Sequence, residues 1–254
     1  MRTGIQVSSL KPILQTEAQV REAFKRMKAM GCTAVQLQWI DPSVSIECIA
    51  GALADAGIAS VSVQDFYEVI RENKAYYVEL NARTGGVWMC VSRVPERLKS
   101  AQGLAQYVKE LSDFQAELEA VGQKLCFHPV RTDFAPIEGV CPVEYLLAQL
   151  PGLSVCLDLY HLNRCGYDMP AWIRRYAGRI CMAHFKDGVK DAAGKEQRVP
   201  AGQGDVRWDV VVKACVEAGV EYGFVEQEAW TRDPFDCLRE ADTWLRGQLE
   251  AARA

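Results

Sequence analysis

The sequence predicts a single α/β domain over residues 1–254, built as a (β/α)₈ barrel of the TIM type. Three observations lead to this prediction. The chain has 254 residues, close to the roughly 250 that such a barrel needs. Short β-rich apolar runs alternate eight times with amphipathic helical segments. No linker rich in proline or glycine, and no shift in composition, marks a second domain.

Each predicted strand is a short run of apolar and β-branched residues that ends at a turn or helix signal. In chain order the predicted strands are residues 4–8, 33–40, 59–63, 86–91, 124–127, 153–159, 179–185 and 222–226. Eight such units with right-handed crossovers favour a closed barrel over an open sheet. The first strand is not followed by the G-x-G-x-x-G pattern of an open dinucleotide-binding sheet.

Each predicted helix has apolar residues at helical spacing and signals at its ends. In the first helix, Thr16 is the expected N-cap and Gly31 ends the segment. In the last helix, Asp233 is the expected N-cap and Pro234 takes the first helical position. In chain order the predicted helices are residues 17–30, 45–56, 73–80, 101–121, 142–150, 169–176, 208–218 and 234–249.

Composition and charge exclude several classes of function. The 29 Lys and Arg residues against 33 Asp and Glu residues give a net charge of −4, which offers no basic face to nucleic acid or to an anionic membrane. The chain has neither a signal-peptide pattern at its start nor an apolar run long enough to span a bilayer. The ten cysteines include no C-x-x-C pair, and we interpret them as buried thiols of a cytoplasmic protein.

Histidines and carboxylates follow three neighbouring strands at the points where these strands end. The chain has three histidines, and each lies at or just beyond a predicted strand end: His128, His161 and His184. Asp158 ends an apolar run, where a carboxylate needs a partner or a cation. Because barrel enzymes place their sites at the C-terminal ends of the strands, we expect these groups to converge there.

Strand alternation adds three more side chains to this set. His184 and Lys186 share one face of the seventh strand, and Glu226 and Glu228 share one face of the eighth. A mixed set of carboxylates and imidazoles suits a divalent cation such as Mn²⁺, Mg²⁺, Co²⁺ or Zn²⁺. An interior salt-bridge network of the same groups is the alternative interpretation.

Four stretches of the sequence carry a family resemblance. They are LDLYH at 157–161, HFKD at 184–187, VPAGQGDVRW at 199–208 and VEQE at 225–228. In this order they resemble the D-x-x-[HW], H-x-K-D, P-x-G-x-G-x-x-x-W and E-x-[DE] motifs of the xylose isomerase-like TIM-barrel superfamily. This superfamily includes sugar phosphate isomerases/epimerases and inosose dehydratases. The order and spacing fit over roughly residues 120–240, and the opening strands fit more loosely.

The resemblance implies roles for the residues at the matching positions. Asp158, His184 and Glu226 would be ligands of a divalent metal ion, with Mn²⁺ favoured. Glu226 would also exchange a substrate proton. His161 and Lys186 would contact substrate oxygens, and the loop over residues 202–204 would help to close the site.

The sequence departs from the family pattern at the end of the fifth strand. Many members have a glutamate there that serves as the fourth ligand and as the second acid/base. This chain has His128 instead, in a segment similar to the family's H-N-H-x-x-E-F version, with Asp133 where the later acid would fall. Since histidine can bind a metal or move a proton near neutral pH, His128 is the expected fourth ligand and second catalytic residue.

The expected reaction is proton transfer alpha to the carbonyl of a sugar, keto-sugar or cyclitol, through an enediolate, which gives isomerisation or epimerisation. Elimination from the same enediolate would make the protein a dehydratase or lyase. A non-catalytic sugar-binding barrel is a third alternative, which the missing glutamate favours. A repair nuclease, also found in this superfamily, is disfavoured by the acidic charge and the three histidines.

Other strand-end residues are weaker candidates for substrate contacts: Gln6, Gln38, Gln64, Arg93 and Glu228. Trp39 and four other tryptophans are expected in the core or at an interface. Relatives in this family often pair, so the resemblance allows a homo-oligomer.

Overall fold

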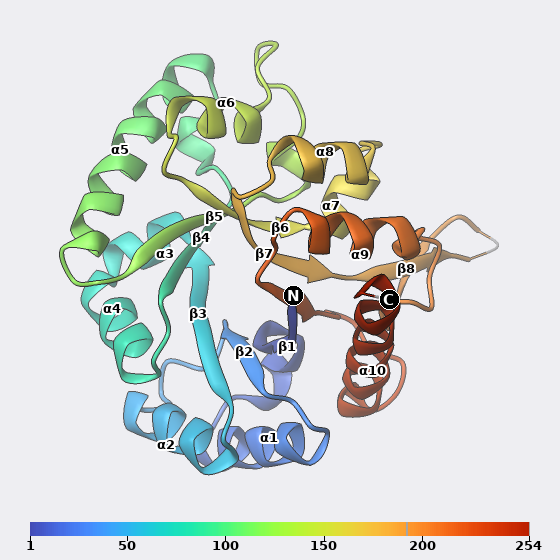
Figure 1. Cartoon of the computed structure of the whole chain (residues 1–254). Coiled ribbons are helices and arrows are strands. Elements are labelled where there is room, and N and C mark those ends of the chain that lie inside the picture. Colours follow the sequence, from blue (N-terminus) through green and yellow to red (C-terminus); the bar gives the residue numbers. More distant parts are fainter. Residues whose placement is uncertain (192, 254) are drawn as a thin grey trace.

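Eight parallel strands close into a barrel surrounded by helices in the computed structural model, which describes residues 1–191 and 193–253 (Figure 1). Seven of the strands follow one another around the barrel, and β10 closes the ring between β7 and β1. The barrel strands are β1 Arg2–Gln6, β2 Ala34–Leu37, β3 Ala59–Phe66, β4 Trp88–Ser92, β5 Lys124–His128, β6 Ser154–Asp158, β7 Ile180–Phe185 and β10 Tyr222–Val225. The predicted barrel is therefore confirmed.

The α-helices cover the outside of this barrel. They are α1 Glu17–Ala29, α2 Ile46–Ala56, α3 Tyr67–Glu72, α4 Lys74–Arg83, α5 Ala101–Glu119, α6 Pro142–Gln149, α7 Leu159–Arg164, α8 Met169–Arg175, α9 Trp208–Glu217 and α10 Pro234–Arg253. The predicted caps are in place, because Thr16 accepts a hydrogen bond from the Gln19 amide and Asp233 accepts one from the Asp236 amide. Short 3₁₀ helices at Val7–Ile13, Glu96–Leu98 and Arg131–Asp133 follow three of the strands.

Two of the features that were not predicted follow the strands β6 and β7. The segment after β7 folds back as an antiparallel hairpin of β8 (Asp187–Lys190) and β9 (Glu196–Val199), where a loop was expected. The helix α7 has only six residues, too few for a periodic apolar pattern to show in the sequence. Both features lie at the C-terminal end of the barrel, directly after β6 and β7.

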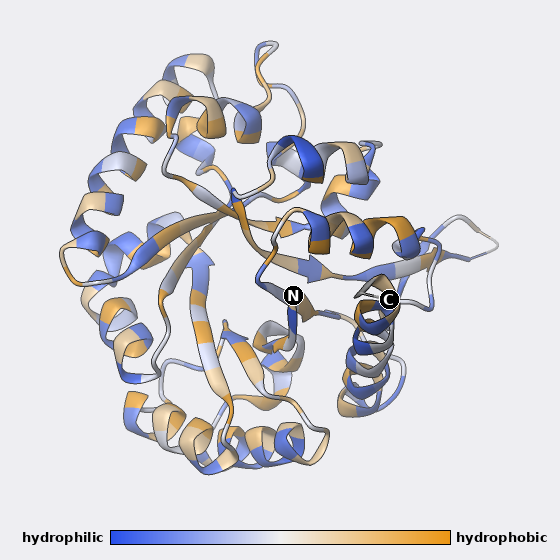
Figure 2. Cartoon of the chain, in the orientation of Figure 1, coloured by the Kyte–Doolittle hydropathy of each residue, from blue (hydrophilic) through white to orange (hydrophobic). Residues whose placement is uncertain are grey.

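Apolar side chains fill two separate regions. The larger lies between the outer face of the barrel and the inward faces of the helices, and Figure 2 shows apolar residues in both the strands and the surrounding helices. The smaller is formed by Ala34, Val61, Cys90, Cys126, Cys156, Cys181, Met182 and Phe224. Eight of the ten cysteines are buried, as expected, and Cys141 and Cys165 are half-buried.

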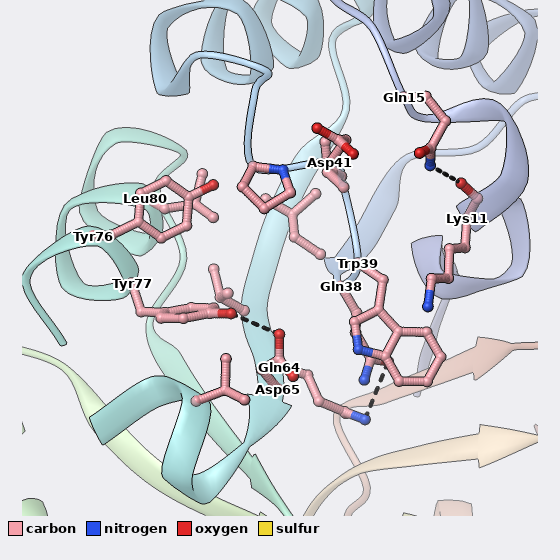
Figure 3. Close-up of a pocket in the computed structure, with 15 residues that line it drawn as sticks. Lys11, Gln15, Gln38, Trp39, Asp41, Gln64, Asp65, Tyr76, Tyr77 and Leu80 are labelled. Carbon is pink, nitrogen blue, oxygen red and sulfur yellow. Dashed lines mark hydrogen bonds between the residues drawn. The ribbon is translucent and has the colours of Figure 1, made fainter. Parts of the chain in front are cut away.

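A cavity of about 270 Å³ opens at the barrel rim, between the ends of β2 and β3 and the helix α4 (Figure 3). Its walls are mainly apolar and aromatic, with polar side chains where the strands end. Among the residues described, no helix combines the length and the apolar character needed to cross a membrane.

Candidate functional site

Asp158 is placed by the turn from β6 into α7. Its Oδ1 accepts a hydrogen bond of 2.8 Å from the His161 amide, so the carboxylate is the N-cap of α7. Its Oδ2 lies 3.0 Å from Lys186 Nζ and 3.7 Å from the Nε2 atoms of His128 and His161. Burial alone would raise the pKa of Asp158, but the charges of these neighbours hold it well below its usual range. Asp158 is therefore a fully buried carboxylate in its charged form.

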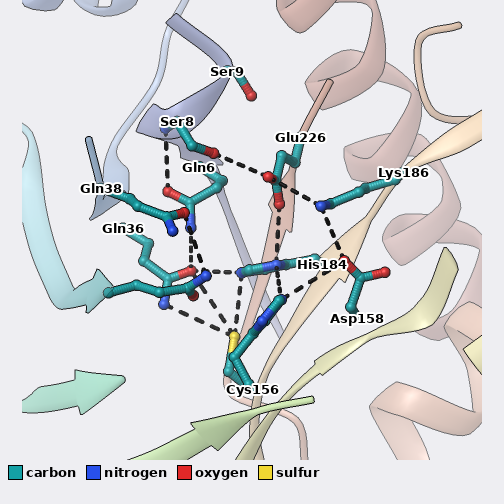
Figure 4. Close-up of polar contacts among 12 residues, drawn as sticks. Gln6, Ser8, Ser9, Gln36, Gln38, Cys156, Asp158, His184, Lys186 and Glu226 are labelled. Carbon is teal, nitrogen blue, oxygen red and sulfur yellow. Dashed lines mark hydrogen bonds and ion pairs between the residues drawn. The ribbon is translucent and has the colours of Figure 1, made fainter. Parts of the chain in front are cut away.

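His184 is oriented by two amide side chains. Its Nε2 lies 2.5 Å from Oε1 of Gln36, and the same oxygen accepts a hydrogen bond of 2.9 Å from Gln6 Nε2 (Figure 4). Since that oxygen can only accept, Nε2 of His184 carries a proton and donates it to Gln36. The other ring nitrogen, Nδ1, faces His128 Nε2 and Glu226 Oε2, each 3.1 Å away. A histidine held in one tautomer by an outer partner is prepared to bind a cation.

His128 lies at the end of β5, next to Ser92 at the end of β4, with which it is in register. Its Nδ1 lies 3.0 Å from Ser92 Oγ. Burial alone would lower the pKa of His128, but the hydrogen bond and charge of Asp158 outweigh burial and raise it. At His161, burial outweighs the charge of Asp158 and lowers the pKa.

Lys186 joins three carboxylates. Its Nζ lies 3.0 Å from Asp158 Oδ2, 3.0 Å from Glu226 Oε1 and 3.3 Å from Glu228 Oε1. Burial would lower the pKa of Lys186, but these negative charges raise it. Glu226 also accepts a hydrogen bond of 3.0 Å from Ser8 Oγ. Burial works to raise the pKa of Glu226, yet Lys186 and His184 lower it to about 2.

The residues present fit a divalent cation. Ligand atoms of His128, Asp158 and His184 all lie within 4.8 Å of one another. Within the described part of the chain, Asp158 Oδ2 and Glu226 Oε2 are buried and have no hydrogen bond, although Lys186 and His184 lie at ion-pair distance from them. Two imidazoles and buried carboxylate oxygens form a donor set that suits several divalent metals. A cation that binds here must compete with Lys186.

The loop before α9 is tied to the same end of the barrel by Asp187. The Gly202 amide and the Trp208 indole nitrogen donate hydrogen bonds of 3.1 and 2.7 Å to Asp187 Oδ2. A Cβ at Gly204 would collide with the Asp187 carboxylate, so this approach requires glycine. Asp187, the last residue of the HFKD stretch, therefore fixes the position of this loop.

Two positions considered in the sequence lie apart from the cluster. The exposed Arg93 guanidinium stacks on Phe66, 3.9 Å from the centre of the ring, on the barrel rim. Asp133 is buried and accepts hydrogen bonds from the Val94 and Val130 amides, so it joins this loop to the end of β4. Gln6 and Glu228 do reach the cluster, through Gln36 and Lys186 respectively.

Sequence reasoning missed Gln36, Ser8 and Ser92. Each is a polar residue in or beside an apolar strand, and each is buried in contact with His184, Glu226 or His128. The signal for Gln36 was present, because Gln36 and Gln38 stand two residues apart and strand alternation places both on one face.

Comparisons with known proteins agree with this fold. Residues 8–253 match the family described as xylose isomerase-like TIM barrel. Three solved structures are similar to the chain over nearly its whole length. A sugar phosphate isomerase/epimerase from Parabacteroides distasonis is 16% identical, with a TM-score of 0.79 and coverage of 99% of this chain and 94% of that chain.

An L-ribulose 3-epimerase is 15% identical, with a TM-score of 0.74 and coverage of 99% of this chain and 95% of that chain. A probable 3-DHS dehydratase from Bacillus anthracis is 14% identical, with a TM-score of 0.74 and coverage of 97% and 99%. None of the curated proteins compared with the chain matches it. At these identities the structural likeness shows the fold alone.

Proposed function

The chain belongs to the xylose isomerase-like TIM barrel family, and from this premise we propose that it is a divalent-metal-dependent isomerase or epimerase of a sugar, keto-sugar or cyclitol. The observation that carries the proposal is the buried cluster of His128, Asp158 and His184 beside Glu226 at one end of the barrel. The reaction would be proton transfer alpha to a carbonyl. Neighbours that are named as epimerases support this class of chemistry.

In this proposal His128, Asp158 and His184 hold the cation, and Glu226 Oε2 joins them. Mn²⁺ is the favoured ion, with Mg²⁺, Co²⁺ and Zn²⁺ as alternatives. When bound, the cation supplies positive charge that stabilises an enediolate.

Glu226 and His128 divide the proton chemistry. Glu226 is ionised at neutral pH, and its Oε1, which contacts Ser8 and Lys186, is the oxygen that would take the proton while Oε2 faces the cation. A substrate oxygen that draws Lys186 away removes the main charge that lowers the pKa of Glu226, and Glu226 becomes a stronger base. His128 is the second residue that would move a proton, and it can do so only while its Nε2 is not bound to the cation.

The remaining candidate residues would contact the substrate. Lys186 and His161 would bind substrate oxygens, while Gln6 acts through Gln36 and Glu228 acts through Lys186. Arg93 would reach the substrate only from the rim. The ten free thiols support a cytoplasmic location, and the expected partner is a small sugar or cyclitol. Pairing of two chains stays a prediction.

Metal content tests the proposal directly. We expect the purified protein to hold close to one divalent ion per chain and Asp158→Ala or His184→Ala to lose it, because each removes one ligand. Elemental analysis after gel filtration measures this. Asp113→Ala, on the exposed side of α5, is the matched control and should keep the ion. Wild-type protein that binds none of the four metals would contradict the proposal.

Deuterium incorporation separates the possible reactions. An isomerase or epimerase incubated with a panel of ketoses and keto-sugars in deuterated buffer should place deuterium on a carbon next to the carbonyl. Glu226→Gln should abolish this exchange. A dehydratase, which the similar Bacillus anthracis protein makes the second candidate, would instead release a product lighter by one water. A sugar-binding protein without catalysis would exchange nothing.

A further inference from the structure

The rim cavity has two unlike walls. Where the strands end, its wall consists of polar side chains, among them Gln38, Gln64 and Asp65. On the side of α4 the wall is aromatic, with Tyr76 and Tyr77 facing Trp39 across the cavity (Figure 3). A ligand that fits this space therefore has a polar end toward the barrel and an apolar end toward α4.

The polar wall connects the cavity to the cluster. Gln36, which contacts His184, precedes Gln38 by two residues, and a strand rises roughly 3.3 Å per residue. Gln38 directly follows Leu37, the last residue of β2, and lines the cavity. Gln64 donates a hydrogen bond of 3.3 Å to Gln38, and both glutamines line the cavity.

Trp39 is held at the edge of the cavity in an unfavourable backbone conformation. Its φ is +56°, a region that a bulky side chain rarely adopts. Lys11 Nζ lies 4.7 Å from the centre of its ring, and the Phe66 ring lies 6.1 Å away. Strain of this kind persists where the surroundings fix a side chain for a task. The half-buried indole is thus a preformed apolar surface at the edge of the cavity.

The opposite wall is fixed as well. The Tyr77 hydroxyl donates a hydrogen bond of 2.6 Å to Asp65 Oδ2, and the Asp65 Oδ1 accepts one of 2.8 Å from the Phe66 amide. Tyr76 packs edge-on against Tyr77. The two aromatic walls therefore keep their separation without a ligand, and a flat apolar ring is the group that such a space accepts.

We propose that the cavity binds the aromatic aglycone of a keto-glycoside, a glycoside with a ketone on its sugar ring, and that this ring lies at the cluster. This inference rests on the proposed function and adds the class of substrate to it. A cavity of roughly 150 Å³ is enough to hold benzene, so about 270 Å³ accommodates a substituted ring. The glycosidic oxygen would lie near Gln38 and Gln64, whose amides can donate to it.

Matched pairs of phenyl and methyl glycosides test the inference. Calorimetric titration of the Mn²⁺-loaded protein with phenyl and methyl β-glucoside, β-galactoside and β-xyloside should give, for at least one sugar, about tenfold tighter binding of the phenyl member. Trp39→Ala should reduce that preference to less than about threefold, because the indole surface is gone. The affinity for the methyl member should stay the same.

Trp88→Ala is the matched control. Trp88 is half-buried at the other end of the barrel, and Lys124 lies over its ring as Lys11 lies over that of Trp39. This variant should keep the phenyl preference. Trp39→Phe retains an aromatic ring at the same place and should keep most of the phenyl preference. This variant separates the loss of stacking from misfolding of the rim.

Three outcomes are informative. A protein that binds metal and exchanges deuterium but shows no phenyl preference for any pair overturns this inference alone. A phenyl preference in a protein that binds no metal and exchanges no deuterium overturns the proposed function instead. If Trp39→Ala changes the oligomeric state measured by light scattering and no pair shows a preference, a second copy of the chain covers the cavity and the inference is wrong.

Discussion

Lys186 holds two buried carboxylates together. Its ammonium group lies 3.0 Å from one oxygen of Asp158 and 3.0 Å from one oxygen of Glu226. A divalent cation would need the same two side chains, so it would compete with the lysine for them. Glu228, whose side chain is 39% exposed, lies 3.3 Å from the ammonium group and offers it a second partner. Removal of the lysine should therefore favour the metal.

We expect Lys186→Met to bind Mn²⁺ at least about tenfold more tightly than the wild type, because an opposing charge is removed from two ligands. Calorimetric titration of the metal-free proteins measures the difference, with circular dichroism as a check on folding. Lys190→Met, on the exposed end of β8, is the control and should bind as the wild type does. Equal or weaker binding by Lys186→Met would show that the lysine does not compete.

At the level of single residues, the sequence predicted which charged and imidazole side chains lie close together, but not the hydrogen bonds that orient each of them. Asp158 and His184 could be predicted to converge because strand ends of a parallel barrel meet at one rim, and the two are in register. The tautomer of His184 depends on Gln36, which comes from a strand on the other side of β1 and β10. Such a contact depends on how the barrel closes, which no local pattern in the sequence encodes.

The loop between β5 and α6 depends on a buried carboxyl group. Asp133 accepts hydrogen bonds of 3.1 Å from the Val94 amide and 2.8 Å from the Val130 amide, and so joins this loop to the end of β4. Burial outweighs these hydrogen bonds and raises the pKa of Asp133 from 3.8 to about 6. The folded protein therefore holds this proton over a pH range in which the unfolded chain has lost it.

The consequence for stability has a definite sign. Since the pKa of Asp133 is higher in the folded state, its contribution is full below about pH 4 and is lost as pH rises to about 6. We expect the free energy of unfolding of the wild type, relative to Asp133→Asn, to fall by about 3 kcal/mol across this range. Urea unfolding of both proteins at several pH values measures it. Parallel pH curves would contradict the prediction.

Among the elements, those with terminal signals were predicted well. The helices α1, α2 and α10 begin after Thr16, Ser45 and Asp233, whose side chains accept from amides of the first turn. The hairpin of β8 and β9 was missed because its strands pair with each other outside the barrel, in a polar stretch without apolar alternation. The helix α7 was missed because its six residues are too few to show a periodic apolar pattern.

Over the whole molecule, the cysteines report on how closely the barrel is packed. Native protein should react rapidly with a thiol reagent at no more than two positions, Cys141 and Cys165, because the other eight thiols are buried. Burial also raises the pKa of Cys32 and of Cys215 to about 12, which removes the reactive thiolate. Counting modified thiols by mass spectrometry tests this prediction.

The control for this experiment is the double variant Cys141→Ser and Cys165→Ser, which should show no rapid labelling. All ten thiols of the wild type should react after unfolding in urea. Rapid labelling of any buried thiol in the native protein would mean that the barrel opens far more often than its packing implies.

The overall architecture could be predicted because it repeats. Eight alternations of strand and helix leave few arrangements other than a closed parallel barrel. The register did not follow from the sequence, since it shifts between Val35 and Gln36 on β2 and between Val155 and Cys156 on β6. These shifts arise from the twist and stagger that closure imposes on all the strands together.

The closure between β1 and β10 also sets the order in which the protein can mature on the ribosome. Ser8 and Glu226, which share a hydrogen bond, are separated by 218 residues of synthesis. At roughly 5–20 residues per second, the nascent chain carries an open strand edge for about 10–40 s before its partner emerges. The carboxylate that completes the cluster is thus translated last, and an unfinished barrel has no site with which to act.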